Sequence, residues 1–156
     1  MAGDGNELAH IDVMIGSKSG PVGNAFARAL ANQEAGFNKL LVTLEPNSAV
    51  KPSTVLVPKV QLSTADETFR LFGPTQYAIA RAVIESVKDG TISKSLCDDW
   101  VIVCGVFIHS GAEDHEKILS YNFEAAKLAI KRALNEEPSI NQVLRQREDI
   151  TAPAAD

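Results

Sequence analysis

Apolar residues along the chain follow two different patterns that predict strands. Leu8–Ile15 alternates apolar and polar residues, which predicts a strand with one buried face. Trp100–Ile108 is almost continuously apolar and rich in β-branched residues, which predicts a central strand. We also expect a buried strand over Asn38–Leu44 and another over Thr54–Leu62. Pro58 lies inside that last segment and has no N–H to donate, which favours a sheet edge or a bulge.

Apolar residues at spacings of three and four predict helices over Val22–Gln33, Ala65–Lys88 and Glu113–Asn135, the second divided at Gly73-Pro74. Ser48–Ser53 is expected to be an ordered loop. The order β-α-β-β-α-β-α predicts an α+β fold, a sheet covered on one face by helices. We take residues 1–156 as a single domain with an ordered core over about 3–138 and a polar, frayed C-terminal tail.

Composition narrows the class of protein. The chain has 156 residues and a formal net charge of -5, which disfavours a broad phosphate-binding surface and hence nucleic acid as a partner. No apolar run is long enough to span a bilayer, and the first residues lack a signal-peptide pattern. The two cysteines form no CxxC pair, which fits a reducing compartment. We therefore expect a cytoplasmic protein without a membrane partner.

His10 and Asp12 are the first candidates for chemistry. They share the polar face of the first strand, about 7 Å apart along it. A histidine exchanges protons near neutral pH, and Asp12 could orient it or hold a cationic ligand. A hydrogen-bonded structural histidine on a solvated strand face explains the same pattern, and the residues alone favour that interpretation.

Weaker candidates lie elsewhere in the chain. Lys59 and Gln61 project together from the proline-bearing strand, although exposed strand lysines usually protect an edge. Gln76 opens a helix and could present its amide to a heterocycle, or simply belong to the helix start. His109 and His115 flank acidic residues, but their spacing matches no metal pattern and fits the first turn of a helix, so we expect no metal.

Taken together, several ordered motifs resemble the formaldehyde-activating enzyme family, the 5,6,7,8-tetrahydromethanopterin hydro-lyases. The first runs from Gly3 to Asp12 as Gly-Asp-Gly-Asn-Glu-Leu-Ala-His-Ile-Asp. The others are Ile15-Gly16, Lys51-Pro52, Phe72-Gly73-Pro74-Thr75-Gln76, Gly105-Val106-Phe107-Ile108-His109 and Tyr121-Asn122-Phe123-Glu124-Ala125. The resemblance extends from Gly3 to about Pro138.

The resemblance implies a fold like the second domain of ribosomal protein S5 and a homopentamer with active sites between subunits. It also implies condensation of formaldehyde with tetrahydromethanopterin to methylene-tetrahydromethanopterin and water. The pterin is then a co-substrate, and neither a tightly bound cofactor nor a metal is implied.

The resemblance assigns His10 as the catalytic acid and Asp12, Leu41, Lys59 and Gln76 as pterin contacts. Gln61 occupies a further contact position at which the family typically has threonine, and the larger amide could crowd the pterin or change which pterin fits. Ser110 stands where the family usually has tryptophan.

Two other functions remain open at this stage. A paralogue altered at positions 61 and 110 could bind formaldehyde or a pterin without catalysis, as a sensor. An RNA-binding module is suggested by the ribosomal fold, but the acidic charge balance argues against it.

Overall fold

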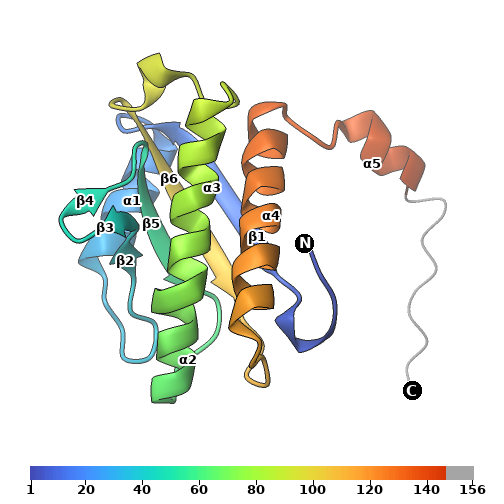
Figure 1. The fold of residues 1–156 in the computed structure, drawn as a ribbon. Helices are drawn as coiled ribbons and strands as arrows, with labels where there is room; N and C mark the ends of the chain where they lie inside the picture. The colour runs from blue at the N-terminus through green and yellow to red at the C-terminus, as the bar shows by residue number, and fades with distance from the viewer. Residues whose placement is uncertain (147–156) are drawn as a thin grey trace.

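A four-stranded sheet with the order β1–β6–β5–β2 forms the centre of the computed structural model, which describes residues 1–146 (Figure 1). β6 (Trp100–Phe107) lies between β1 (His10–Ser17), which runs antiparallel to it, and β5 (Ser53–Pro58), which runs parallel. β2 (Leu40–Leu41) pairs antiparallel with the outer side of β5. The central position predicted from the apolar run of β6 is confirmed.

The edge position predicted for the proline-bearing strand is wrong, because β5 has neighbours on both sides. Pro58 is the last residue of β5, and β2 pairs only with Val55 and Leu56. The next N–H, that of Lys59, donates to Val106 on β6. Successive N–H groups of a strand point to opposite sides, so the missing donor of Pro58 falls on the side where β2 has already ended.

The segment expected to be one buried strand over 38–44 is instead split. β2 is followed by β3 (Thr43–Glu45), which forms a hairpin with β4 (Ser48–Ala49), so the expected loop over 48–53 contains a strand. Val42 is buried, but Leu40, Leu41 and Leu44 are 37–42% exposed. A two-residue edge strand has too little sheet around it to cover its leucines.

Three consecutive helical pieces and one long helix cover the first face of the sheet (Figure 1). α2 (Ala65–Arg70) leads through a π-helical turn (Leu71–Thr75) into α3 (Gln76–Lys88), and α4 (His115–Leu134) lies beside α3. The wide turn accommodates Pro74, which cannot make a normal helical hydrogen bond. The division expected at Gly73-Pro74 is therefore this wide turn, and the chain stays helical through it.

The helix starts explain where this layer begins. Thr64 and Glu67 form a capping box at α2, and the Asp114 carboxylate caps α4 by accepting the N–H groups of Glu116 and Lys117. The core between helices and sheet contains Ile11, Leu56, Ile79, Val83, Ile102, Cys104, Val106, Ala125, Ala126 and Ile130. On α4, Ile130 is buried in this core, whereas Leu128 is exposed.

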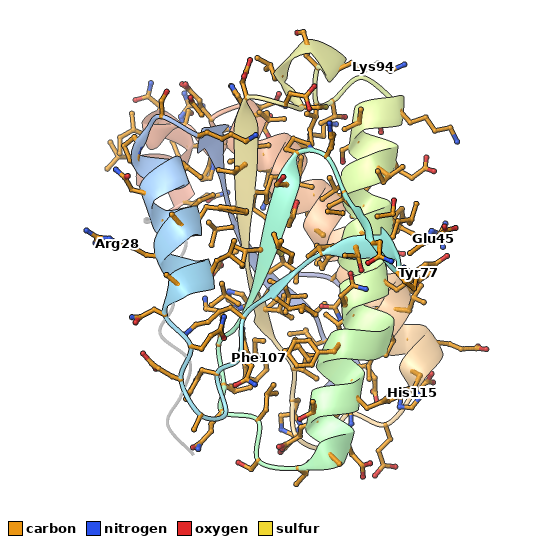
Figure 2. The ribbon with its side chains drawn as sticks, turned by 90° about the vertical axis from the view of Figure 1, so that its left-hand side faces the viewer. Arg28, Glu45, Tyr77, Lys94, Phe107 and His115 are labelled. Carbon is orange, nitrogen blue, oxygen red and sulfur yellow. The ribbon has the colours of Figure 1, made fainter. Side chains whose placement is uncertain are left out.

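α1 (Pro21–Ala31) packs on the opposite face of the sheet from α3 and α4 (Figure 2). The expectation of helices on one face only is therefore wrong, although the α+β class is confirmed. Gly16 on β1 allows the close approach of α1 to the sheet, because a Cβ at position 16 would lie 3.1 Å from the Val22 side chain. Val55, Val101 and Val103 are buried on this second face. The other half of that face, which carries His10 and Asp12, we call the open half.

Short elements complete the described residues. They are the 3-10 turns η1 (Gly5–Glu7) and η3 (Lys94–Leu96) and the helix α5 (Ile140–Gln146). α5 lies beyond the core expected to end near 138 and continues away from the sheet (Figure 1). The last residues expected to be frayed, 147–156, lie outside the described residues. Within 1–146, no helix has the length and apolar character that crossing a membrane requires.

Candidate active site

The open half of the sheet places residues from three strands in two adjacent rows. His10 on β1 is the register partner of Phe107 on β6, and Lys59, just after β5, bonds back to β6 through its N–H. The next row contains Asp12 opposite Gly105. Partners in register share a face of the sheet, so these side chains project on the same side.

Asp12 connects the two basic residues of this group. Its Oδ1 lies 3.2 Å from Nε2 of His10, and its Oδ2 accepts a hydrogen bond from the ammonium of Lys59. The side chains of His10, Asp12 and Lys59 are 45%, 54% and 40% exposed, so all three are accessible to a ligand. The structure thus brings together three of the residues predicted from the sequence.

Gly105 makes the contact between Lys59 and Asp12 possible. A Cβ at this position would lie 3.5 Å from Cδ of Lys59 and 3.7 Å from Cβ of Asp12. The aliphatic part of Lys59 therefore crosses the strand at a residue without a side chain. Sequence reasoning noted this glycine only as part of a motif and did not give it a role.

The first motif fixes the segment that precedes β1. The Glu7 carboxylate accepts the N–H groups of Glu113 and Asp114, and the Asn6 amide donates to the carbonyl of Gly111. The N–H groups of Glu113 and then Asp114 lower the pKa of Glu7. Both residues thereby tie the chain just before His10 to the loop that follows β6.

Gly3 packs against the last motif. It has a φ of +83° and lies so close to the ring of Tyr121 that a Cβ would come within 2.0 Å of it. Two motifs at opposite ends of the sequence are therefore in contact, which neither of them indicates alone.

Leu41 and Gln76 lie at the other edge of the sheet. Leu41 is in β2, three strands from β1, or about 14 Å at the usual strand spacing. The Gln76 Oε1 accepts the N–H of Thr43 at 2.8 Å, which holds the start of α3 to β3. Figure 2 shows Glu45 of β3 beside Tyr77 of α3. Within one chain, Leu41 and Gln76 are not brought to His10.

Gln61 lines a cavity of about 270 Å³ next to the open half. Ser110 lines the same cavity, so the two positions that differ from the resembled pattern meet at one place. Gln61 packs on Gly36, whose φ is +80° and where a Cβ would lie 2.6 Å from Cγ of Gln61. Phe107, whose role sequence reasoning missed, also lines this cavity.

His109 and His115 make separate contacts and do not form one site. Nδ1 of His109 accepts the N–H of Gly111, and the ring of His115 packs against Phe69 with centroids 5.3 Å apart. Among residues 1–146, no three histidine, cysteine or acidic side chains are grouped as a metal site would require.

A histidine beside a carboxylate and an ammonium, on an exposed sheet face, is an arrangement suited to acid–base chemistry on a small molecule. Residues 1–155 match the family described as formaldehyde-activating enzyme, and the chain belongs to this family.

Curated relatives with the name "Bifunctional enzyme Fae/Hps" are similar to the chain. The protein from Methanosarcina acetivorans is 50% identical over 146 residues, which are 94% of this chain and 37% of the relative. The protein from Methanosphaera stadtmanae is 45% identical over 153 residues, 98% of this chain and 38% of the relative. The chain therefore spans less than two fifths of the length of these relatives.

Proposed function

We propose that the chain condenses formaldehyde with tetrahydromethanopterin to methylene-tetrahydromethanopterin and water, with His10 as the general acid. One observation carries the proposal: His10 and Asp12, 3.2 Å apart, lie exposed on the open half of the sheet in a member of the formaldehyde-activating family. An accessible imidazole can pass a proton to a bound substrate, and the neighbouring carboxylate can fix the orientation of the ring.

The reaction needs a proton at one defined step. A pterin nitrogen attacks formaldehyde to give a hydroxymethyl amine. The His10 imidazolium donates its proton to the hydroxyl, the C–O bond breaks and water leaves. The second amine attacks the resulting iminium and loses its proton to the neutral imidazole, which restores His10. General acid catalysis of this kind contributes about 10²–10⁴-fold.

The neighbours of His10 stabilise the charges that form during the reaction and position the substrate. The Asp12 carboxylate lies where it stabilises both the imidazolium and the iminium. Lys59 holds that carboxylate in place and offers an ammonium to the polar edge of the pterin. Neither role requires a metal or a tightly bound cofactor.

The position of Leu41 and Gln76 supports a shared site between subunits. These two residues lie at the far edge of the sheet from His10, so a second copy of the chain that presents them to His10 would let both contact the same pterin ring. We therefore propose a homo-oligomer, a homopentamer by resemblance, that acts in the cytoplasm. Native mass spectrometry measures the number of subunits.

The test is the rate of methylene-tetrahydromethanopterin formation, followed by pterin absorbance with and without the protein. We expect a rate well above the spontaneous one, which His10→Ala reduces sharply while the oligomer stays intact. A rate equal to the spontaneous one would overturn the proposed activity, and near-normal turnover of His10→Ala would overturn the role of His10.

A second candidate, a pterin-binding protein without catalysis, rests on Gln61, because its large side chain lines the cavity beside the site. Pterin binding without rate acceleration would favour it. Recovery of turnover in Gln61→Thr would then identify the amide as the cause.

A further inference from the structure

The cavity beside the open half has room for a group that formaldehyde does not have. Its volume is about 270 Å³. An apolar cavity of roughly 150 Å³ is enough to hold one benzene ring. Formaldehyde carries only hydrogen on its carbonyl carbon, so the proposed reaction gives this space no occupant.

Most of the wall of this cavity is apolar. Its apolar surface comes from Val60, Leu62, Phe107 and Ile108, and Gln61, His109 and Ser110 add polar atoms. Transfer of hydrocarbon from water to such a wall is favourable in proportion to the area that is buried. An alkyl chain is therefore a group that this cavity stabilises.

Glu67 gives the lining a negative charge. Its carboxylate accepts the N–H groups of Ser63 and Thr64 in the capping box. The Ser63 N–H, the largest of several contributions, lowers the pKa of Glu67, so the carboxylate is charged at neutral pH. A second carboxylate in the cavity would lose hydration beside a like charge. The cavity therefore disfavours an anionic group.

The cavity begins one side chain away from His10. Phe107 is the register partner of His10 on β6, and it also lines the cavity. The Cβ atoms of such partners lie about 4.5–5.5 Å apart. A chain of a few carbons, attached to the carbon that reacts at His10, spans this distance.

Ser110 leaves the space open. Its small side chain lines the cavity, at the position where the resembled family usually has tryptophan. A bulky side chain at position 110 would take up part of the cavity volume. Since the resemblance combines tryptophan at this position with the same pterin, a filled cavity is compatible with pterin binding. The open space is then available to the other reactant, the aldehyde.

We propose that this cavity holds the substituent of a larger aldehyde, so that the chain also condenses aldehydes that carry an uncharged alkyl chain of a few carbons. The inference rests on the proposed function and extends its substrate class. The atoms balance as they do for formaldehyde. Each of the two pterin amines loses one proton and bonds to the carbonyl carbon, and the carbonyl oxygen leaves as water. His10 donates to the leaving hydroxyl, and the alkyl chain stays on the bridging carbon.

Pentanal and succinic semialdehyde are a matched pair of probes. Both have an aldehyde on a short chain, which ends in a methyl group in pentanal and in a carboxylate in succinic semialdehyde. Condensation of each with tetrahydromethanopterin is followed by pterin absorbance, with and without the protein, beside formaldehyde. We expect the protein to accelerate the reaction of pentanal. Relative to the spontaneous rates, kcat/KM should be about tenfold or more higher for pentanal than for succinic semialdehyde.

Ser110→Leu and Ser110→Trp fill the cavity in steps. The carbonyl of Ser110 accepts a hydrogen bond from Arg70, and a side-chain change leaves that bond intact. Burial of one methylene is worth about fourfold in kcat/KM. We therefore expect Ser110→Trp to lower the ratio of kcat/KM for pentanal to kcat/KM for formaldehyde by about tenfold or more, and Ser110→Leu to lower it less.

Ser95→Trp is the matched control for these variants. Ser95 is exposed in η3 next to Lys94, and Figure 2 shows Lys94 and Phe107 at opposite ends of the sheet. Ser95→Trp should leave the ratio unchanged. Circular dichroism checks that each variant is folded.

The outcomes separate this inference from the proposed function. Acceleration with formaldehyde but not with pentanal, or an unchanged ratio in Ser110→Trp, would overturn the inference and leave the proposed function. No acceleration with either aldehyde overturns both activities. Calorimetric Kd values for pentanamide, which keeps the carbonyl and the chain but does not condense with amines, then decide about the cavity. Weaker binding to Ser110→Trp retains it as a site for an alkyl chain, and equal or absent binding overturns that as well.

Discussion

The ammonium of Lys59 reaches the carboxylate of Asp12 from two strands away, and it does so by crossing β6. The crossing point is Gly105, where the lysine methylenes occupy the space of a side chain. The charge arrangement around His10 therefore depends on a residue that carries no functional group. A substitution at Gly105 therefore tests this arrangement without removing any charged group from the site.

Gly105→Val is expected to displace Lys59 from Asp12 and to raise KM for the pterin by about tenfold, because the branched side chain takes the path of the lysine. Gly105→Ala is the matched control. Its Cβ would make contacts of 3.5 Å and longer, which are ordinary, and turnover should stay near normal. Steady-state kinetics of both variants measure this. A similar KM in both variants would show that the crossing does not matter.

His10→Ala is expected to lower kcat by about 10²–10⁴-fold, because the proposed reaction loses its proton donor. Met14→Ala is the control on the same strand and face, since Met14 is 49% exposed and lies four residues further along β1. Its kcat should stay within a factor of about two. A comparable loss of kcat in both variants would mean that His10→Ala lowers activity by disturbing the strand and not by removing a proton donor.

Glu7→Gln is expected to destabilise the fold at neutral pH and much less in acid. The folded-state pKa of Glu7 lies below its ordinary value of 4.5, because the N–H groups of Glu113 and Asp114 bind the charged form. The stabilisation is thus fully present above pH 4.5 and is lost as the pH falls through the lowered pKa. Melting temperatures at pH 7 and pH 3 measure it. Glu124→Gln, an exposed change on α4, is the control and should show no such pH dependence.

If the site is shared between subunits as proposed, subunits that each lack one half of it are expected to complement each other. His10→Ala and Gln76→Ala homo-oligomers should both have low activity, whereas oligomers refolded from a mixture should recover part of it, because some interfaces pair an intact His10 with an intact Gln76. Two preparations of His10→Ala mixed in the same way are the control. Native mass spectrometry shows whether the mixture contains hybrid oligomers. If hybrids are present and activity does not recover, both residues belong to the site of a single subunit.

Cys104 is expected to resist thiol reagents in the folded protein, because burial raises the pKa of its thiol to about 12. Burial also raises the pKa of Cys97. Ellman's reagent should label both thiols quickly only after denaturation. Fast labelling of Cys97→Ser at neutral pH would show that β6 opens in the native state.

Local pattern predicted the long elements and missed the short ones. β6, α3 and most of α4 have enough consecutive apolar residues to identify them, and α1 was predicted to within two residues. The pattern gave no information about which side of the sheet α1 covers, because that depends on the close contact of Gly16 with Val22. Pro58 was placed wrongly for a similar reason, since the length of its neighbour β2 decides whether its missing donor matters.

The same limit applies to the site. Alternation along β1 is sufficient to place His10 and Asp12 on one face, and the structure confirms it. The contribution of Lys59 depends on strand order, and the roles of Phe107 and Gly105 depend on register. None of these can be read from one sequence segment, because each is a contact between segments far apart in the chain.

The strand order also has a kinetic consequence. The residues that meet at the open half come from three segments separated by about fifty positions each, joined by the parallel pairing of β5 with β6. Contacts of such large sequence separation form slowly, because the loops between them must close first. None of these three segments contains the complete group by itself. During refolding, recovery of pterin turnover should therefore lag behind recovery of helix, and catalysis should report completion of the sheet.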